Sequence, residues 1–137
     1  MMRRCLPPLL LITLAPLVAW ADQRIEVFVA DEKTETKARQ AASSQAAIYR
    51  VDQVQQRLRA LESQLPDDPD EALDQARRSL NEAEKQRLEE ALRAVALAVG
   101  LGIDQVPAVV IDRAAVVYGT TDPGEARQYL REAKDVP

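Results

Sequence analysis

The chain has 137 residues, a formal net charge of −4, no histidine and a single cysteine, Cys5. Without histidine there is no Ser-His or Cys-His nucleophile pair and no imidazole ligand for zinc, copper or haem. Its 22 acidic residues are able to form an acid/base pair or a weak calcium site, but none stands in a D-x-[DN]-x-[DN]-G pattern. We therefore expect no cofactor and no metal.

The first 21 residues have the features of a cleavable export signal. Arg3 and Arg4 precede an apolar run from Leu6 to Trp20, and Ala19-Trp20-Ala21 gives a small-x-small cleavage pattern before Asp22. The alternative is a membrane anchor, but a spanning helix needs roughly 20 apolar residues, whereas this run has 15, including three prolines. We expect a periplasmic domain, 22–137, with no membrane span, no cysteine and, after loss of two arginines, a charge of −6 instead of −4.

The mature part opens with a strand. Ile25–Val29 is apolar, β-branched and aromatic with one charge, which is typical of a buried strand. Segment 30–45 is polar and alanine-rich, and both a loop and a weak helix remain open for it. Segment 46–51 predicts a second strand through Ile48 and Tyr49.

A long helical insertion follows. Asp52 is the expected N-cap of its first helix, with Gln55 as the returning partner of a capping box. An apolar stripe then recurs at spacings of 3 and 4: Val51, Val54, Leu58, Leu61 and Leu65. We expect this stripe to pack on the sheet of its own chain, and contact with a partner helix is the alternative. A second helical stretch starts at Pro69 behind the N-cap Asp68 and runs to Val99. A phase shift near Asn81 indicates a kink or two consecutive helices.

The last third changes character, because all four glycines lie between positions 100 and 124. They bracket two apolar runs, 106–112 and 116–119, which predict a β-hairpin. A tight primed turn prefers Gly or Asn at positive φ, so Arg113 predicts a looser turn over 112–115. Asp122 and Pro123 then begin a final helix. Its expected buried residues are Ala126, Tyr129, Leu130 and Ala133.

With segment 30–45 as a helix, the element order is βαβ followed by ββα. That order resembles a thioredoxin-like α/β (α+β) fold, here one domain over 22–137 with a long helical insertion; a helix-dominated α+β domain is the alternative. In thioredoxin-like domains a cis proline precedes the third strand, and Val106-Pro107 occupies this place. The redox motif would follow the first strand, where 30–33 reads Ala-Asp-Glu-Lys, so we expect a version without redox activity.

Several segments carry a more specific resemblance: Ile25–Val29, 49–52 leading into Arg57-Leu58, 65–69 with Ala72, and above all 102–122. They resemble a family of exported proteins encoded on bacterial integrating conjugative elements, distantly similar to the thioredoxin-like pilus-assembly proteins of F-type conjugation. One position departs from that family, which usually has glycine where Arg113 stands. The resemblance implies a non-enzymatic periplasmic component of a conjugative, type IV secretion-like apparatus that contacts the protein components of that apparatus. Because the mature chain is acidic, we expect no direct binding of nucleic acid.

The candidate structural or interaction loop consists of Val106, Pro107, Asp112, Tyr118 and Gly119. Pro107 either marks a groove for an added peptide strand or only shapes its loop, and we favour the second interpretation. Tyr118 and Tyr49 are expected in the core. The alternative function is a small periplasmic enzyme that uses carboxylates only. Such an enzyme would depend on the acid pair Asp104 and Asp112, and we do not favour this alternative.

Overall fold

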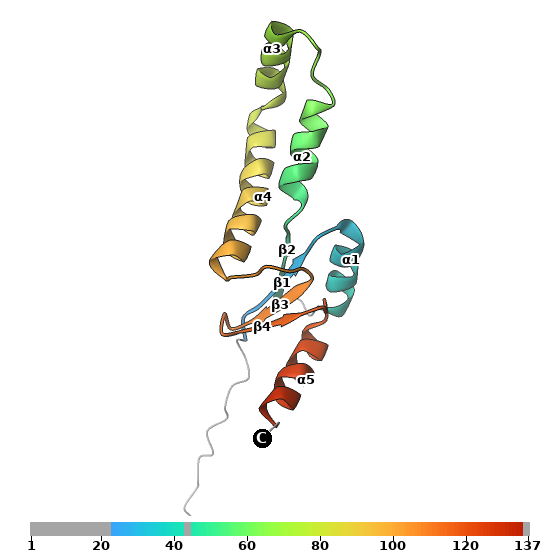
Figure 1. Cartoon of the computed structure of the whole chain (residues 1–137), viewed down its shortest axis with the longest axis vertical. Coiled ribbons are helices and arrows are strands. Elements are labelled where there is room, and N and C mark those ends of the chain that lie inside the picture. The colour runs from blue at the N-terminus through green and yellow to red at the C-terminus, as the bar shows by residue number, and fades with distance from the viewer. Residues whose placement is uncertain (1–22, 43–44, 136–137) are drawn as a thin grey trace, which may run out of the picture.

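The computed structural model describes residues 23–42 and 45–135 (Figure 1). In chain order the elements are β1 (Ile25–Val29), α1 (Glu32–Ala41), β2 (Ala46–Arg50), α2 (Gln53–Glu62), α3 (Pro69–Ser79), α4 (Glu82–Gly100), β3 (Ala108–Ile111), β4 (Ala115–Tyr118) and α5 (Pro123–Lys134). The ambiguous segment 30–45 therefore contains a helix, α1. The export signal predicted for residues 1–21 lies outside the described residues and stays a prediction.

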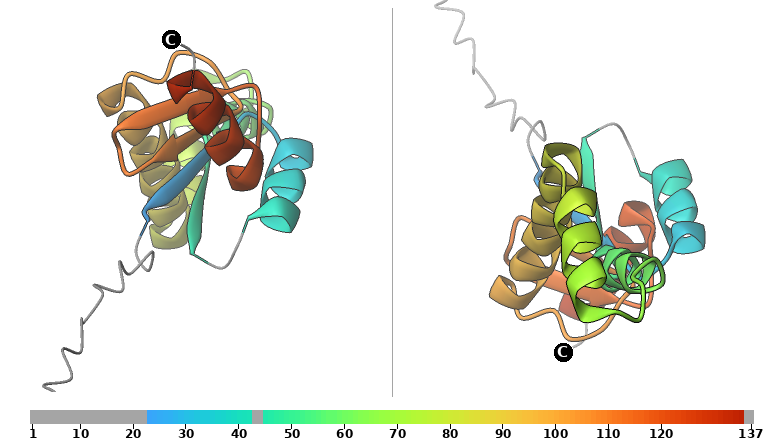
Figure 2. Two further views of the ribbon diagram at one scale, coloured as in Figure 1. Left: turned by 90° about the horizontal axis from the view of Figure 1, so that it is seen from below. Right: turned by 90° about the horizontal axis from the view of Figure 1, so that it is seen from above.

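The strands form one mixed sheet in the order β2-β1-β3-β4. β1 runs parallel to β2 and antiparallel to β3, and β3 pairs antiparallel with β4. α1 and α5 pack on one face of this sheet and α4 on the other (Figure 2). The predicted α+β fold, with its βαβ and ββα halves joined by a long helical insertion, is confirmed.

Both faces of the central strand β1 are buried, because successive side chains point to opposite sides of a sheet. Val27 packs with Ala38 of α1 and Ala126 of α5. Phe28, on the other face, packs with Ala98 of α4 and stacks on Tyr49, with ring centroids 5.1 Å apart. These two layers hold the fold together.

The insertion forms a helical arm, defined here as α2, the link 63–68, α3 and α4 (residues 53–100). Figure 1 shows α2 beside α4, with α3 at the far end from the sheet. Asn81 caps α4 by accepting a hydrogen bond from the N–H of Glu84 at 2.9 Å, so the predicted phase shift separates two helices. Asp68 caps α3 as predicted, accepting from the N–H groups of Asp70 and Glu71 at 3.0 Å.

The prediction that the α2 stripe packs on the sheet is wrong. α2 has no buried residue, and Leu58 is 46% exposed. The helix lies against α4, to which Arg57 is bound by an ion pair with Glu84 at 2.9 Å. Val51, which precedes the helix, packs against the Phe28 cluster. In the described part of the chain, the stripe residues on α2 itself lie mainly against α4, because α2 projects past the edge of the sheet with the rest of the arm.

The capping box predicted at Asp52 is also absent. Asp52 has helical backbone angles, and its side chain makes no cap hydrogen bond. Instead its carboxylate accepts from Nε and Nη2 of Arg50 at 3.0 and 2.9 Å, and Gln56 donates to it as well. The Asp52 carboxylate thus binds the guanidinium of Arg50 in place of the backbone N–H groups that an N-cap side chain would bind.

The last helix is buried over less of its length than predicted. Its first turn is capped by Asp122, which accepts from the N–H of Gly124 at 2.7 Å, and Ala126 is fully buried. Leu130 packs at the margin of the same core. Tyr129 is 51% exposed and Ala133 is exposed, because the C-terminal half of α5 extends beyond the sheet (Figure 1).

Candidate functional site

Four of the five sequence-predicted site residues meet at one end of the sheet. The Val106-Pro107 peptide bond is cis, as predicted. The N–H of Gly119 donates to the carbonyl of Pro107 at 2.9 Å, and Tyr118 lies opposite Ala108 in the β3–β4 ladder. Gly119 has φ +84°, a region that favours glycine. We refer to this region as the cis-proline end.

Asp112 is not part of that cluster. It lies in the β3–β4 turn, at the opposite end of β3, and exchanges two hydrogen bonds with Arg24: N–H to carbonyl at 2.8 Å and Arg24 N–H to Oδ1 at 2.9 Å. Its role is to join the turn to the start of β1. Asp104 lies beside Val106, so the strand β3 separates the two aspartates by roughly 13 Å or more at 3.3 Å per residue. They do not form a catalytic pair.

The start of α1 borders the cis-proline end, because Phe28 pairs with Ala108 in antiparallel register. Here Asp31 and Thr34 form a reciprocal capping box: Thr34 N–H donates to Asp31 Oδ1 at 2.8 Å, and Asp31 N–H donates to Thr34 Oγ1 at 3.3 Å. The hydrogen bond from the Thr34 N–H lowers the pKa of Asp31 below its ordinary value. Immediately after β1, this chain therefore has a carboxylate engaged in starting a helix.

An apolar cavity of about 200 Å³ opens beside Val106. It is lined by Val51, Val95, Ala98, Val99, Ile103, Asp104, Gln105 and Val106. Val99 is 71% exposed and Tyr118, which was expected in the core, is 41% exposed. Tyr118 is the last residue of the edge strand β4, so no further strand or helix covers its ring. The cis-proline end therefore offers apolar surface to another molecule, with polar groups of Asp104 and Gln105 beside it.

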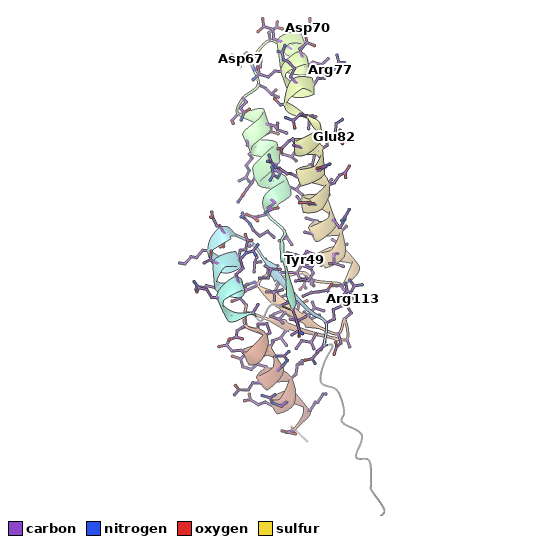
Figure 3. All side chains as sticks on the ribbon, turned by 180° about the vertical axis from the view of Figure 1, so that it is seen from behind. Tyr49, Asp67, Asp70, Arg77, Glu82 and Arg113 are labelled. Carbon is purple, nitrogen blue, oxygen red and sulfur yellow. The ribbon has the colours of Figure 1, made fainter. Side chains whose placement is uncertain are left out.

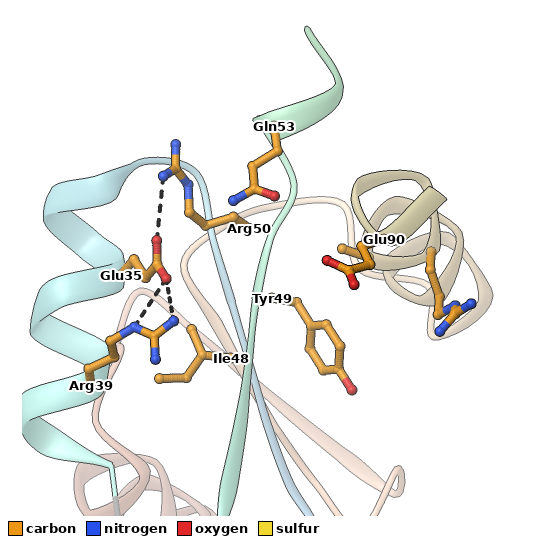
Figure 4. Close-up of a pocket in the computed structure, with 9 residues that line it drawn as sticks. Glu35, Arg39, Ile48, Tyr49, Arg50, Gln53 and Glu90 are labelled. Carbon is orange, nitrogen blue, oxygen red and sulfur yellow. Dashed lines mark hydrogen bonds and ion pairs between the residues drawn. The ribbon is translucent and has the colours of Figure 1, made fainter. Parts of the chain in front are cut away.

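A second hollow, of about 290 Å³, lies along the free edge of β2 between α1 and α4 (Figure 4). Glu35 of α1 binds Arg39 at 2.6 Å and Arg50 at 3.4 Å. The hydrogen bond from Arg50 to Asp52 raises the pKa of Arg50 above its ordinary value. Tyr49 and Glu90 lie on the other side of the strand (Figure 4). This hollow combines residues from four elements, α1, β2, α2 and α4, and no sequence motif marks it.

The buried ion pair between Glu26 and Arg113 was also not predicted from the sequence. Glu26 is only 1% exposed, and Arg113 donates to its two carboxylate oxygens at 3.0 and 3.2 Å. Arg24 adds a contact at 3.3 Å. The hydrogen bond to Glu26 raises the pKa of Arg113. Since 87 residues separate Arg113 from Glu26, no local pattern in the sequence predicts this pair.

That ion pair explains why the predicted looser hairpin turn is wrong. The turn is tight, with the N–H of Ala114 bound to the carbonyl of Ile111 at 3.1 Å. Asp112 and Arg113 both adopt positive φ, +52° and +55°, which is unfavourable for residues with a side chain. Hydrogen bonds to Arg24 and Glu26 hold these two residues in a conformation that glycine would adopt at lower cost.

Two further features bear on the kind of site that the described residues offer. Within 23–42 and 45–135, no group of three or more acidic side chains is arranged to hold a metal ion. Among the same residues, no helix has both the length and the apolar character that crossing a bilayer requires.

The fold and the cis-proline end define an α+β protein with a mixed sheet in the order β2-β1-β3-β4, in which the aspartate that follows β1, Asp31, caps a helix. Residues 23–135 match the family described as a protein of unknown function, DUF1525, and the chain belongs to this family. Neither the curated proteins nor the solved structures include a match to the chain.

Proposed function

We propose that this protein is a non-enzymatic, exported component of the conjugative, type IV secretion-like DNA-transfer apparatus of an integrating conjugative element, and that it acts by contacting other proteins of that apparatus. The resemblance of segments 25–29, 49–58 and 102–122 to exported proteins of such elements suggests the setting. The observation that carries the mode of action is the apolar cavity beside Val106, which exposed Val99 lines, with exposed Tyr118 at the same end of the sheet.

The charge of the chain supports contact with protein over contact with DNA. Binding to a phosphate backbone is driven by release of counterions around several lysines or arginines. Here acidic residues outnumber basic ones, 22 to 18, and the two arginines before the apolar run are removed with the predicted signal. The surface at the cis-proline end is apolar with one acidic residue, Asp104, which suits a protein surface.

The proposal predicts that deleting the gene lowers mating transfer of the element by at least an order of magnitude. A copy with its export signal should restore transfer, whereas a copy lacking residues 2–21 should not. The measurement is the number of transconjugants per donor cell. Unchanged transfer in the deletion strain would refute the conjugative role, and full rescue by the copy without the signal would refute export.

Substitutions at the cis-proline end test the mode of action. Val99→Asp with Tyr118→Asp should fail to restore transfer, because both side chains are exposed and their replacement disturbs contact more than folding. The matched control is Tyr129→Asp on α5, 51% exposed, which should restore it. Immunoblots of the periplasmic fraction verify equal abundance.

A further inference from the structure

The leucines of the helical arm are unusually accessible. Leu58, Leu73, Leu80 and Leu92 are 46, 50, 36 and 49% exposed. The remaining leucines of the arm are only half-buried. A hairpin of two helices covers one side of each apolar stripe and leaves the other side in water. Of the seven large apolar residues that are exposed in the described part of the chain, five lie on the arm, these four leucines and Val99. Such clustering of exposed apolar side chains is typical of an interaction surface.

We propose that the arm is a self-association surface on which two copies of this chain pack antiparallel. Two helical hairpins that face one another form a four-helix arrangement, in which leucines of both are buried. A two-fold contact of this kind uses the same patch on both copies. This inference goes beyond the proposed function and does not depend on it, because self-association is a property of the isolated protein.

The size of the arm suffices for a stable dimer. α3 and α4 together contain 30 residues, about 45 Å of helix at 1.5 Å per residue, and two adjacent helices are about 20 Å across. Only α2, with 10 residues, doubles the width of this helical rod, so the face is on the order of 600 Å² per copy, the lower limit of what each partner buries in a standard-size interface.

The distribution of charge along the arm selects the orientation. The tip, residues 62–79, has six acidic residues and two arginines, Arg77 and Arg78, and thus a net charge of −4; its acidic residues are Glu62, Asp67, Asp68, Asp70, Glu71 and Asp74. Figure 3 shows Asp67 and Asp70 at this end. Nearer the sheet, segments 53–59 and 87–100 contain four arginines and two acidic residues. Antiparallel packing places each acidic tip against the basic part of the other arm, whereas parallel packing would bring the two tips together.

The oligomeric state of the purified protein, produced from the full coding sequence, tests the proposal. Light scattering coupled to size exclusion should give twice the protomer mass. Leu58→Arg with Leu92→Arg should give the protomer mass, while circular dichroism shows that the helices are retained. Tyr129→Arg, at an equally exposed position outside the arm, should remain dimeric. A monomeric unsubstituted protein would overturn the proposal, as would a dimer that the two arginines leave intact.

Cysteine crosslinking tests the orientation even where a leucine variant fails to fold. In a Cys5→Ser background no other thiol is present. A mixture of Asp70→Cys and Arg59→Cys proteins should give a mixed dimer with a short bismaleimide, and Asp70→Cys alone should give none. Efficient tip-to-tip crosslinking, or failure of the mixed pair to crosslink, would overturn the antiparallel arrangement. Crosslinking of Asp70→Cys only to an added envelope protein would assign the arm to a different partner and would also overturn it.

Discussion

Arg113→Ala should lower the melting temperature by roughly 10 °C, since a buried carboxylate that loses its partner costs several kcal/mol and each kcal/mol shifts the melting temperature of a domain of this size by several degrees. Arg113 provides two of the hydrogen bonds to Glu26, which is 1% exposed. Thermal unfolding followed by circular dichroism measures the loss. Arg24→Ala is the matched control: Arg24 makes one contact of 3.3 Å to the same carboxylate, so its loss should shift the transition less.

Two further variants distinguish the effect of the unpaired charge of Glu26 from the effect of the backbone conformation at position 113. Adding Glu26→Met to Arg113→Ala should recover part of the lost stability, because the unpaired buried charge is then gone. Arg113→Gly should be less destabilising than Arg113→Ala, since glycine tolerates the φ of +55° at this position. If Glu26→Met lowered the melting temperature by the same amount with or without Arg113, the ion pair would contribute nothing, and our explanation of the turn would be wrong.

Phe28→Ala should lower the free energy of unfolding by about 3 to 5 kcal/mol, the usual cost of removing a buried phenylalanine ring. Phe28 is fully buried between the sheet and α4, and it stacks on Tyr49. Urea denaturation with linear extrapolation gives the value. Tyr129→Ala, at a position 51% exposed, should change the same quantity by less than about 0.5 kcal/mol. A loss below about 1 kcal/mol for Phe28→Ala would mean that the α4 side of the sheet is not a packed core.

Local sequence rules predict the structure correctly where one short segment determines it. The pairs Asp68-Pro69 and Asp122-Pro123 mark the starts of α3 and α5, because capping involves residues only two or three apart. The composition of Ile25–Val29 likewise identified β1 as buried. Together these elements gave the order from which the α+β fold follows.

Prediction from the sequence fails where distant residues determine a local conformation. Arg113 adopts a turn conformation that favours glycine because it binds Glu26, far away in the chain. The spacing of Leu58 shows that one side of α2 is apolar, but spacing does not tell whether a sheet, a helix or another copy covers that side. Residues from four elements meet at the β2 hollow, so its existence depends on the tertiary fold and not on a motif.

The exposed tyrosine at the cis-proline end permits the most direct test of the central claim, that the protein works by contacting the conjugative apparatus. A photocrosslinking amino acid in place of Tyr118 would be activated in mating cells, and the captured protein would be identified by mass spectrometry. The same substitution at Tyr129, exposed on α5, is the control. We predict that position 118, but not 129, captures a protein encoded by the same mobile element. Capture from position 118 of only proteins encoded elsewhere, or the same pattern from both positions, would contradict the account.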